Sequence, residues 1–251
     1  METKRILISQ TEPSGTSPYT DLIAKWGVSI DFRPFFRVEG VSVRDFIAQR
    51  VTILDYTAIV FTSRLAIDSF FKICEQTRVN IPETMKYFCQ SEAIAVYLQK
   101  YIVYRKRKIF YGTGTVASMV AAIGTKHKNE NFLIACTDSL KPDVHKLFTK
   151  ENLKHGSAVF VRTVNNDIHD INLHDYQVAA FYSPADVKSL QDNYPDFRQD
   201  NLVFVTYGPS TAKAMKEAGL AVAIPAPTPE ARSIAEALAR YLETGGTAAH
   251  E

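Results

Sequence analysis

The sequence carries one motif twice, and this repeat is the feature that most restricts its fold. Residues 55–64 read DYTAIVFTSR and residues 175–184 read DYQVAAFYSP. Both copies begin with Asp-Tyr, continue through an apolar run that ends in Phe, and place a Ser two residues after that Phe. The second copy starts 120 residues after the first. This spacing predicts two similar domains, because solenoid repeats have periods of about 20–50 residues.

A second pair of segments follows the two copies in the same order. Residues 87–95 read YFCQSEAIA and resemble residues 205–212, which read VTYGPSTA. Two similar domains joined in one chain create a cleft, and clefts are where ligands commonly bind.

Apolar runs alternate with amphipathic segments along the whole chain. Ser17 and Pro18 predict a helix start that Gly27 ends. Ser210 is expected to cap a later helix, and the Thr-Pro-Glu of residues 228–230 is expected to open the last one. Strands that alternate with helices predict an α/β fold with parallel sheets covered by helices on both faces.

The composition is that of a globular protein, with 46% hydrophobic and 22% charged residues among 251. No apolar run reaches the roughly 18 residues of a membrane-spanning helix, so no membrane association is expected. Residues 1–5 lead directly into a predicted strand, so no secretory signal is expected. Three cysteines without CxxC spacing favour a reducing compartment. We therefore expect a cytoplasmic protein.

Several functional classes lack their motifs. The six histidines show no metal-binding spacing, and neither a GxGxxG loop nor a Gly-x-Ser-x-Gly elbow occurs. Residues 105–108, RKRK, form the one basic cluster of a chain whose net charge is +2. This cluster could steer a polyanionic ligand or be a solvated surface, but it does not support nucleic-acid binding. A flavodoxin-like redox protein is a weaker alternative.

Four segments in a fixed order resemble the uroporphyrinogen-III synthase family. They are FTSR at residues 61–64, FYSP at 181–184, GPSTA at 208–212 and APTPEA at 226–231. The resemblance covers nearly the whole chain. Residues 97–108 are similar to a branch of the family known from Bacteroidetes-type sequences.

The resemblance implies two flavodoxin-like α/β domains with parallel sheets, joined by a two-stranded connector. It places residues 1–34 and 168–251 in a discontinuous first domain, residues 40–161 in the second, and the connectors at 35–39 and 162–167. The residues alone also allow a simple tandem of two domains.

The reaction implied by the resemblance closes hydroxymethylbilane into uroporphyrinogen III. Water leaves the hydroxymethyl end, the last pyrrole is attacked at its substituted carbon, and a spiro intermediate recloses with that ring inverted. Neither a metal nor an organic cofactor is expected. The resemblance also implies a monomer without nucleic-acid partners, with transient contact to hydroxymethylbilane synthase, the enzyme that makes the substrate.

Helix starts that follow buried strands supply the candidate site residues. Free N–H groups at such positions suit the carboxylates of the substrate, although an N-cap serine needs no ligand. The residues expected to bind substrate are Gln10, Ser63, Arg64, Ser91, Ser183, Pro184, Tyr207 and Gly208. Thr211 is the expected catalytic residue, because the family has a functionally important threonine in the matching segment.

Three positions depart from the family pattern. Ile94 stands where the family often has a threonine, Val161 where it has a tyrosine, and Gln10 where it often has an arginine. Tyr182 or Tyr207 could replace the missing tyrosine. The departures leave open a second hypothesis, a non-catalytic two-domain module that binds a tetrapyrrole or another polyanion.

Overall fold

The computed structural model describes residues 4–138 and 142–245. The chain forms two compact units, Met1–Arg37 with Val164–Glu251 (unit 1) and Val38–Thr163 (unit 2). Because unit 1 is discontinuous, the chain passes between the units twice, at residues 37–38 and again at 163–164.

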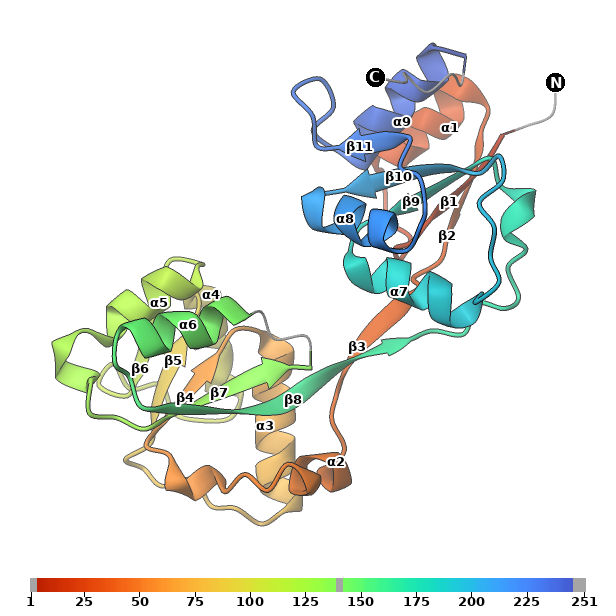
Figure 1. The fold of residues 1–251 in the computed structure, drawn as a ribbon. Helices are drawn as coiled ribbons and strands as arrows, with labels where there is room; N and C mark the ends of the chain where they lie inside the picture. Colours follow the sequence, from red (N-terminus) through yellow and green to blue (C-terminus); the bar gives the residue numbers. More distant parts are fainter. Residues whose placement is uncertain (1–3, 139–141, 246–251) are drawn as a thin grey trace. The chain divides into compact units, whose positions relative to one another are not determined.

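Unit 1 is a parallel sheet with helices on both faces (Figure 1). Its strands are, in spatial order, β11 (Ile224–Ala226), β10 (Val203–Tyr207), β9 (Val178–Phe181), β1 (Arg5–Ile8) and β2 (Ser29–Phe32). Ile6 and Ile8 pack with helices α1 (Pro18–Trp26) and α9 (Ile234–Glu243). Leu7, between them, packs with α7 (Pro184–Asn193) and α8 (Pro209–Glu217) on the opposite face. Alternate side chains of one strand thus bury both faces of the sheet.

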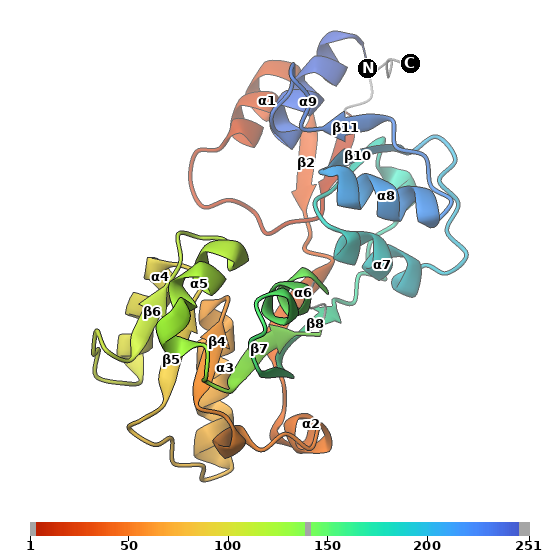
Figure 2. The ribbon, with the colours of Figure 1, turned by 60° about the vertical axis from the view of Figure 1, so that its left-hand side comes forward.

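Unit 2 repeats this arrangement, as the second view also shows (Figure 2). Its parallel strands are, in order, β8 (His155–Asn165), β7 (Phe132–Thr137), β4 (Ala58–Phe61), β5 (Lys86–Cys89) and β6 (Ile109–Tyr111). One face carries α2 (Val43–Ala48), α3 (Arg64–Gln76) and α4 (Glu92–Tyr97), and the other α5 (Val116–Ile123) and α6 (Pro142–Lys150). Short 3-10 helices are η1 (Ile53–Asp55), η2 (Leu98–Lys100), η3 (Thr125–His127) and η4 (Leu173–Asp175).

Two paired strands carry the chain between the units. Strand β3 (Phe36–Gly40) lies beside β8. The Val41 N–H donates to the Phe160 carbonyl at 3.0 Å, and the Asn166 N–H donates to the Phe35 carbonyl at 2.9 Å. Since partners run in opposite directions along the two strands, β3 and β8 are antiparallel.

The sequence repeat corresponds to a repeat of structure. In each unit a 3-10 helix (η1 or η4) leads into a fully buried strand (β4 or β9), and a serine, Ser63 or Ser183, then caps the next helix. The predicted fold class, two similar α/β domains with parallel sheets, is confirmed.

Helix ends follow the sequence signals unevenly. Helix α1 begins after Ser17 and ends at Gly27, whose φ of 61° is left-handed, so both predicted ends are confirmed. The cap predicted at Ser210 is wrong, because Pro209 already occupies the first helical position and Gly208 the cap. The opening predicted at residues 228–230 is also wrong. Those residues form a turn, and Ser233 caps α9 by accepting the Glu236 N–H at 3.2 Å.

None of the helices in the described ranges is both long and apolar enough to cross a membrane.

Candidate functional site

The predicted site residues of unit 1 follow the carboxyl ends of its central strands. Gln10 lies just beyond β1, Ser183 and Pro184 follow β9, Tyr207 ends β10, and Gly208 follows it. Because β10, β9 and β1 are parallel neighbours, these residues gather at one edge of the sheet. Ligands of open parallel sheets bind at this edge, beyond the carboxyl ends of the strands.

A hollow of about 500 Å³ lies at this edge, and we call it the edge hollow. It brings together Gln10, Ser183 and Tyr182, the last being one of the two tyrosines that could replace the missing one. Pro184, Tyr207, Gly208 and Thr211 do not line it. Among the described residues its lining is Ser9, Gln10, Thr11, Pro34, Phe36, Tyr182, Ser183 and Asp186.

The start of α7 in the edge hollow is closed by a carboxylate of its own chain. Asp186 Oδ2 accepts the N–H groups of Tyr182 at 3.0 Å and Ser183 at 2.8 Å, and the Ser183 hydroxyl at 3.2 Å. This is the acidic half of a capping box. The Ser183 N–H was expected to be free for a substrate carboxylate, but Asp186 occupies it.

Asp186 was not among the predicted site residues. Only 1% of its surface is exposed, and burial raises the pKa of its carboxyl. The N–H groups of Tyr182 and Ser183 act in the opposite direction without cancelling the effect of burial. The only sequence signal was an acid three residues after Ser183, which is equally typical of any helix start. A carboxyl that is this buried and lines a hollow is a candidate functional group.

Buried polar atoms without hydrogen-bond partners gather at the same edge. Within the described residues, they are Ser9 Oγ, Asp186 Oδ1, Thr206 Oγ1 and Thr211 Oγ1, and one more, Trp26 Nε1, lies on α1. Most buried polar groups in proteins are paired, so such atoms mark places where a ligand or a movement supplies the partner. Thr211, the expected catalytic residue, is fully buried in the first turn of α8.

Three tyrosines border the edge hollow or its neighbourhood. The hydroxyls of Tyr19 on α1 and Tyr182 after β9 form a hydrogen bond, and the rings of Tyr182 and Tyr207 stack with centroids 6.0 Å apart. Burial raises the pKa of both Tyr19 and Tyr182. Their hydroxyls therefore stay protonated at neutral pH, where they can donate hydrogen bonds.

In unit 2 the predicted residues Ser63 and Arg64 open α3 directly after β4. The Ser63 hydroxyl accepts the Ala66 N–H at 3.1 Å, so Ser63 is an N-cap. The Arg64 guanidinium lies 5.4 Å from the centre of the Tyr97 ring and is exposed. A guanidinium stacked in this way keeps its N–H groups available for a carboxylate.

A carboxylate on α3 holds this aromatic partner in place. Asp68 accepts the hydroxyls of Tyr97 at 2.9 Å and Tyr101 at 2.5 Å, and pairs with Lys100 at 2.9 Å. Burial alone would raise the pKa of Asp68, but these three donors together lower it. The negative charge of Asp68 is thus satisfied within the cluster, and Arg64 is left as its outward cation.

The remaining positions in unit 2 offer less chemistry. Ser91 precedes α4 after β5, and its side chain makes no capping hydrogen bond. Ile94 packs against the hydrophobic core, and Val161 is a buried member of it. The two residues that replace the family's threonine and tyrosine therefore contribute packing and have no polar group.

The basic run lies at the opposite edge of the unit 2 sheet from Ser63. Residues 105–108 precede β6, and the Lys108 carbonyl accepts the N–H of Tyr87 near the start of β5. Arg105 and Lys108 pair with the exposed Glu83 at 3.0 and 3.7 Å. The run therefore does not line the carboxyl edge, and any effect on an anionic ligand acts through long-range attraction.

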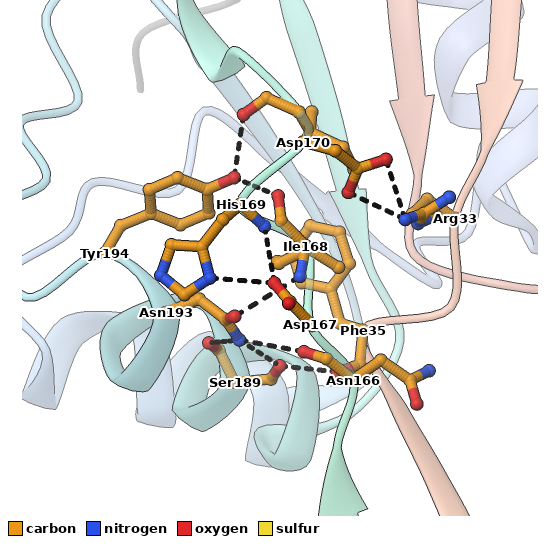
Figure 3. Close-up of polar contacts among 11 residues, drawn as sticks. Arg33, Phe35, Asn166, Asp167, Ile168, His169, Asp170, Ser189, Asn193 and Tyr194 are labelled. Carbon is orange, nitrogen blue, oxygen red and sulfur yellow. Dashed lines mark hydrogen bonds and ion pairs between the residues drawn. The ribbon is translucent and has the colours of Figure 1, made fainter.

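Helix α7 also holds both segments of unit 1 that lead to the other unit (Figure 3). The Ser189 hydroxyl donates to the Phe35 carbonyl at 2.5 Å. The Asn193 side chain donates to the Asn166 carbonyl at 3.0 Å and accepts the Ile168 N–H at 3.3 Å. Because Asp186, Ser189 and Asn193 are spaced three and four residues apart, they form one buried polar face of the helix. One helix thus lines the edge hollow and bonds the backbone close to both points where the chain leaves unit 1.

A second hollow of about 500 Å³ lies at the amino edge of the unit 1 sheet. Its lining includes Leu173, His174, Tyr194, Phe197 and Arg198, and none of the predicted site residues. The buried Ser9, Asp186, Thr206 and Thr211 atoms without hydrogen-bond partners therefore distinguish the carboxyl edge from the amino edge.

Comparisons with known proteins bear on the family and the fold of the chain. A family model described as uroporphyrinogen-III synthase HemD matches residues 17–236. A mutant uroporphyrinogen III synthase from the bacterium Thermus thermophilus has a similar structure, with a TM-score of 0.54 and 14% identity over 96% of this chain and 100% of that one. The uroporphyrinogen-III synthetase of Helicobacter pylori is also similar in structure, with a TM-score of 0.54 and 13% identity over 96% of this chain and 100% of that one. At these identities the likeness shows the fold. No curated protein matches the chain.

Proposed function

Because the chain belongs to the uroporphyrinogen-III synthase family, we propose that it converts hydroxymethylbilane into uroporphyrinogen III with loss of one water. The family match over residues 17–236 is the observation that carries this proposal. The hydroxymethyl C–O bond breaks, and the pyrrole nitrogen next to it supplies the electron pair. The cation that forms is attacked by the last pyrrole at its substituted carbon, and the resulting spiro centre reopens and recloses with that ring inverted.

The protein's part in this reaction is to fold a flexible polycarboxylate so that its two ends meet, which is catalysis by positioning. We assign the binding of substrate carboxylates to the strand ends of both units. Gln10, Ser183, Pro184, Tyr207 and Gly208 contribute in unit 1, and Ser63, Arg64 and Ser91 in unit 2. The repeated helix starts at Ser63 and Ser183 support this assignment.

Thr211 is the residue that we assign to the leaving hydroxyl. Its own hydroxyl is buried at the carboxyl edge and makes no hydrogen bond within the described residues, which supports a role toward a ligand. We further propose that the protein acts as a cytoplasmic monomer and receives its substrate through transient contact with hydroxymethylbilane synthase.

A coupled assay tests the activity directly. Hydroxymethylbilane is generated in place by its synthase, the protein is added, and the oxidised porphyrin isomers are separated by chromatography. We expect the type III isomer to dominate, against type I in a reaction without the protein. Type I alone, formed at the uncatalysed rate, would contradict the proposal and leave the polyanion-binding module as the function.

A further inference from the structure

Asp186 has one satisfied oxygen and one without a partner. Oδ2 accepts three hydrogen bonds at the start of α7, whereas Oδ1 is buried and accepts none. The Ser9 hydroxyl favours the ionised form of this carboxyl, although the two groups do not reach hydrogen-bond geometry. A buried, ionised carboxylate oxygen that accepts no hydrogen bond raises the free energy of the folded protein. Protonation of that oxygen removes the charge and lowers this cost.

The edge hollow beside Asp186 has the character of an anion site without a cation. Besides Asp186, its polar lining is Ser9, Gln10, Thr11, Tyr182 and Ser183, and among residues 4–138 and 142–245 no Lys, Arg or His lines it. Attraction for an anion comes from the helix dipole at the N-terminal end of α7 and from the side chains of Ser9, Gln10 and Thr11, because the donors of Ser183 are already bonded to Asp186. A carboxylate that enters this hollow comes close to the Asp186 carboxylate, and two carboxylates in one low-dielectric site do not both stay ionised.

We propose that the edge hollow takes one carboxylate arm of the substrate, and that Asp186 takes up one proton as this carboxylate binds. The inference rests on the proposed function for the identity of the ligand. The proton comes from solvent and goes to the unpartnered oxygen of Asp186, while the arm of the substrate stays ionised. Asp186 then turns from a repelling charge into a hydrogen-bond donor, and release of the product returns the proton.

The residues that face Asp186 present neutral hydroxyl groups, so Asp186 is the one carboxyl among them that can take up a proton. On β9 and the residues after it these are Tyr182 and Ser183, and after β1 it is Ser9. Tyr19 of α1 and Tyr207 of β10 lie one step further, against Tyr182. Within the described part of the chain, burial and the residues Ser9, Tyr182 and Ser183 are the main influences on the pKa of Asp186, and no lysine, arginine or histidine is among them. Burial raises this pKa before any ligand enters, which makes protonation less costly.

Calorimetry with uroporphyrinogen III under anaerobic conditions tests the inference. Titrations between pH 6 and 8 in phosphate and in Tris, whose ionisation enthalpies differ, count the protons taken up on binding. We expect uptake of up to one proton per protein, and a Kd that rises with pH, by up to tenfold per pH unit at the upper end of this pH range.

Asp186→Asn keeps an acceptor for the capping N–H groups and presents an amide donor. It is expected to bind without this uptake and with a Kd independent of pH. Asp196→Asn, an exposed aspartate at the other edge, is expected to behave like the wild type.

Wild-type binding without proton uptake would overturn the inference, as would equal uptake by Asp186→Asn. The wild-type measurement keeps the inference testable even if that variant fails to fold. The isomer assay on the same preparation separates the two proposals. Type III product without proton uptake contradicts only the role of Asp186. Uptake without type III product supports the carboxylate site and contradicts the synthase activity.

Discussion

Asn193, in the last turn of α7, donates a hydrogen bond from its side-chain amide to the backbone carbonyl of Asn166 at 3.0 Å (Figure 3). The same amide group accepts the Ile168 N–H, so one buried side chain satisfies the backbone where the chain re-enters unit 1. The helix that holds this segment begins at Ser183 in the edge hollow. The side chain of Asn193 therefore ties this segment to α7.

Replacing Asn193 by Ala should lower the free energy of unfolding by about 1–3 kcal/mol, because a buried N–H and a buried carbonyl lose their partner. Denaturant unfolding followed by circular dichroism measures the change. Gln191→Ala, an exposed position on the same helix, should stay within about 0.5 kcal/mol of the wild type. Equal stability of Asn193→Ala and Gln191→Ala would show that the hydrogen bonds of Asn193 contribute nothing net.

Two buried threonines provide a matched test of the catalytic assignment. Thr206 and Thr211 are both fully buried, and neither hydroxyl has a partner in the described residues. Thr211→Val keeps the volume and removes the hydroxyl, so we expect the rate of type III formation to fall about 10²-fold. Thr206→Val, within β10, should keep its rate and its stability, since valine no longer buries an unpartnered hydroxyl. Equal rates for the two variants would remove Thr211 from the mechanism.

The features that the sequence predicted well are local or periodic. The Ser17 cap and the Gly27 stop act within one turn of α1, and the repeated apolar runs became the fully buried strands β4 and β9. Signals of this kind need no knowledge of distant residues. The prediction was wrong where two possible helix starts lay close together. The Thr-Pro-Glu run from Thr228 forms a turn, and Ser233, five residues later, caps the helix.

The properties of the site depend on contacts between residues far apart in the chain. The raised pKa of Asp186 comes from burial at a sheet edge that includes Ser9, which belongs to the first strand end of the chain. The hydrogen bond between Tyr19 and Tyr182 likewise joins α1 to the end of β9. A sequence pattern identifies Asp186 as a helix-capping acid, but only the packing shows that its second oxygen is without a partner.

The ion pair of Lys86 and Glu130 should give unit 2 a pH-dependent stability. Burial disfavours ionisation of Glu130, but the Lys86 ammonium and the Thr57 hydroxyl outweigh it and hold the pKa of Glu130 below its usual value. A lowered pKa means that the stabilisation is present above about pH 4.3 and is lost as pH falls through the folded-state pKa.

Glu130→Gln should therefore unfold about 1 kcal/mol more easily at pH 7, since the pair is partly exposed. The difference should shrink toward about pH 2 as Glu130 takes up a proton. Urea unfolding at both pH values measures the difference. The control Glu83→Gln removes the ion pairs of Glu83 with Arg105 and Lys108. Because Glu83 is 81% exposed, its free energy of unfolding should change by close to zero at either pH. A Glu130→Gln deficit that persists unchanged at low pH would mean that packing, not charge, is responsible.

Arg64 should bind substrate rather than accelerate the chemistry. Its guanidinium stacks on Tyr97 at the start of α3, where the helix end also attracts anions. Arg64→Ala should raise KM for hydroxymethylbilane about three- to tenfold and leave kcat nearly unchanged, because an exposed charge contributes modestly and equally to ground and transition states. The difference should shrink as salt increases. Lys150→Ala removes an exposed charge from the last turn of α6, at the amino edge of the unit 2 sheet, and should leave KM within about twofold of the wild type. An equal rise of KM in both variants would indicate general attraction by the charge of the protein, and a fall in kcat for Arg64→Ala would give this arginine a part in the reaction itself.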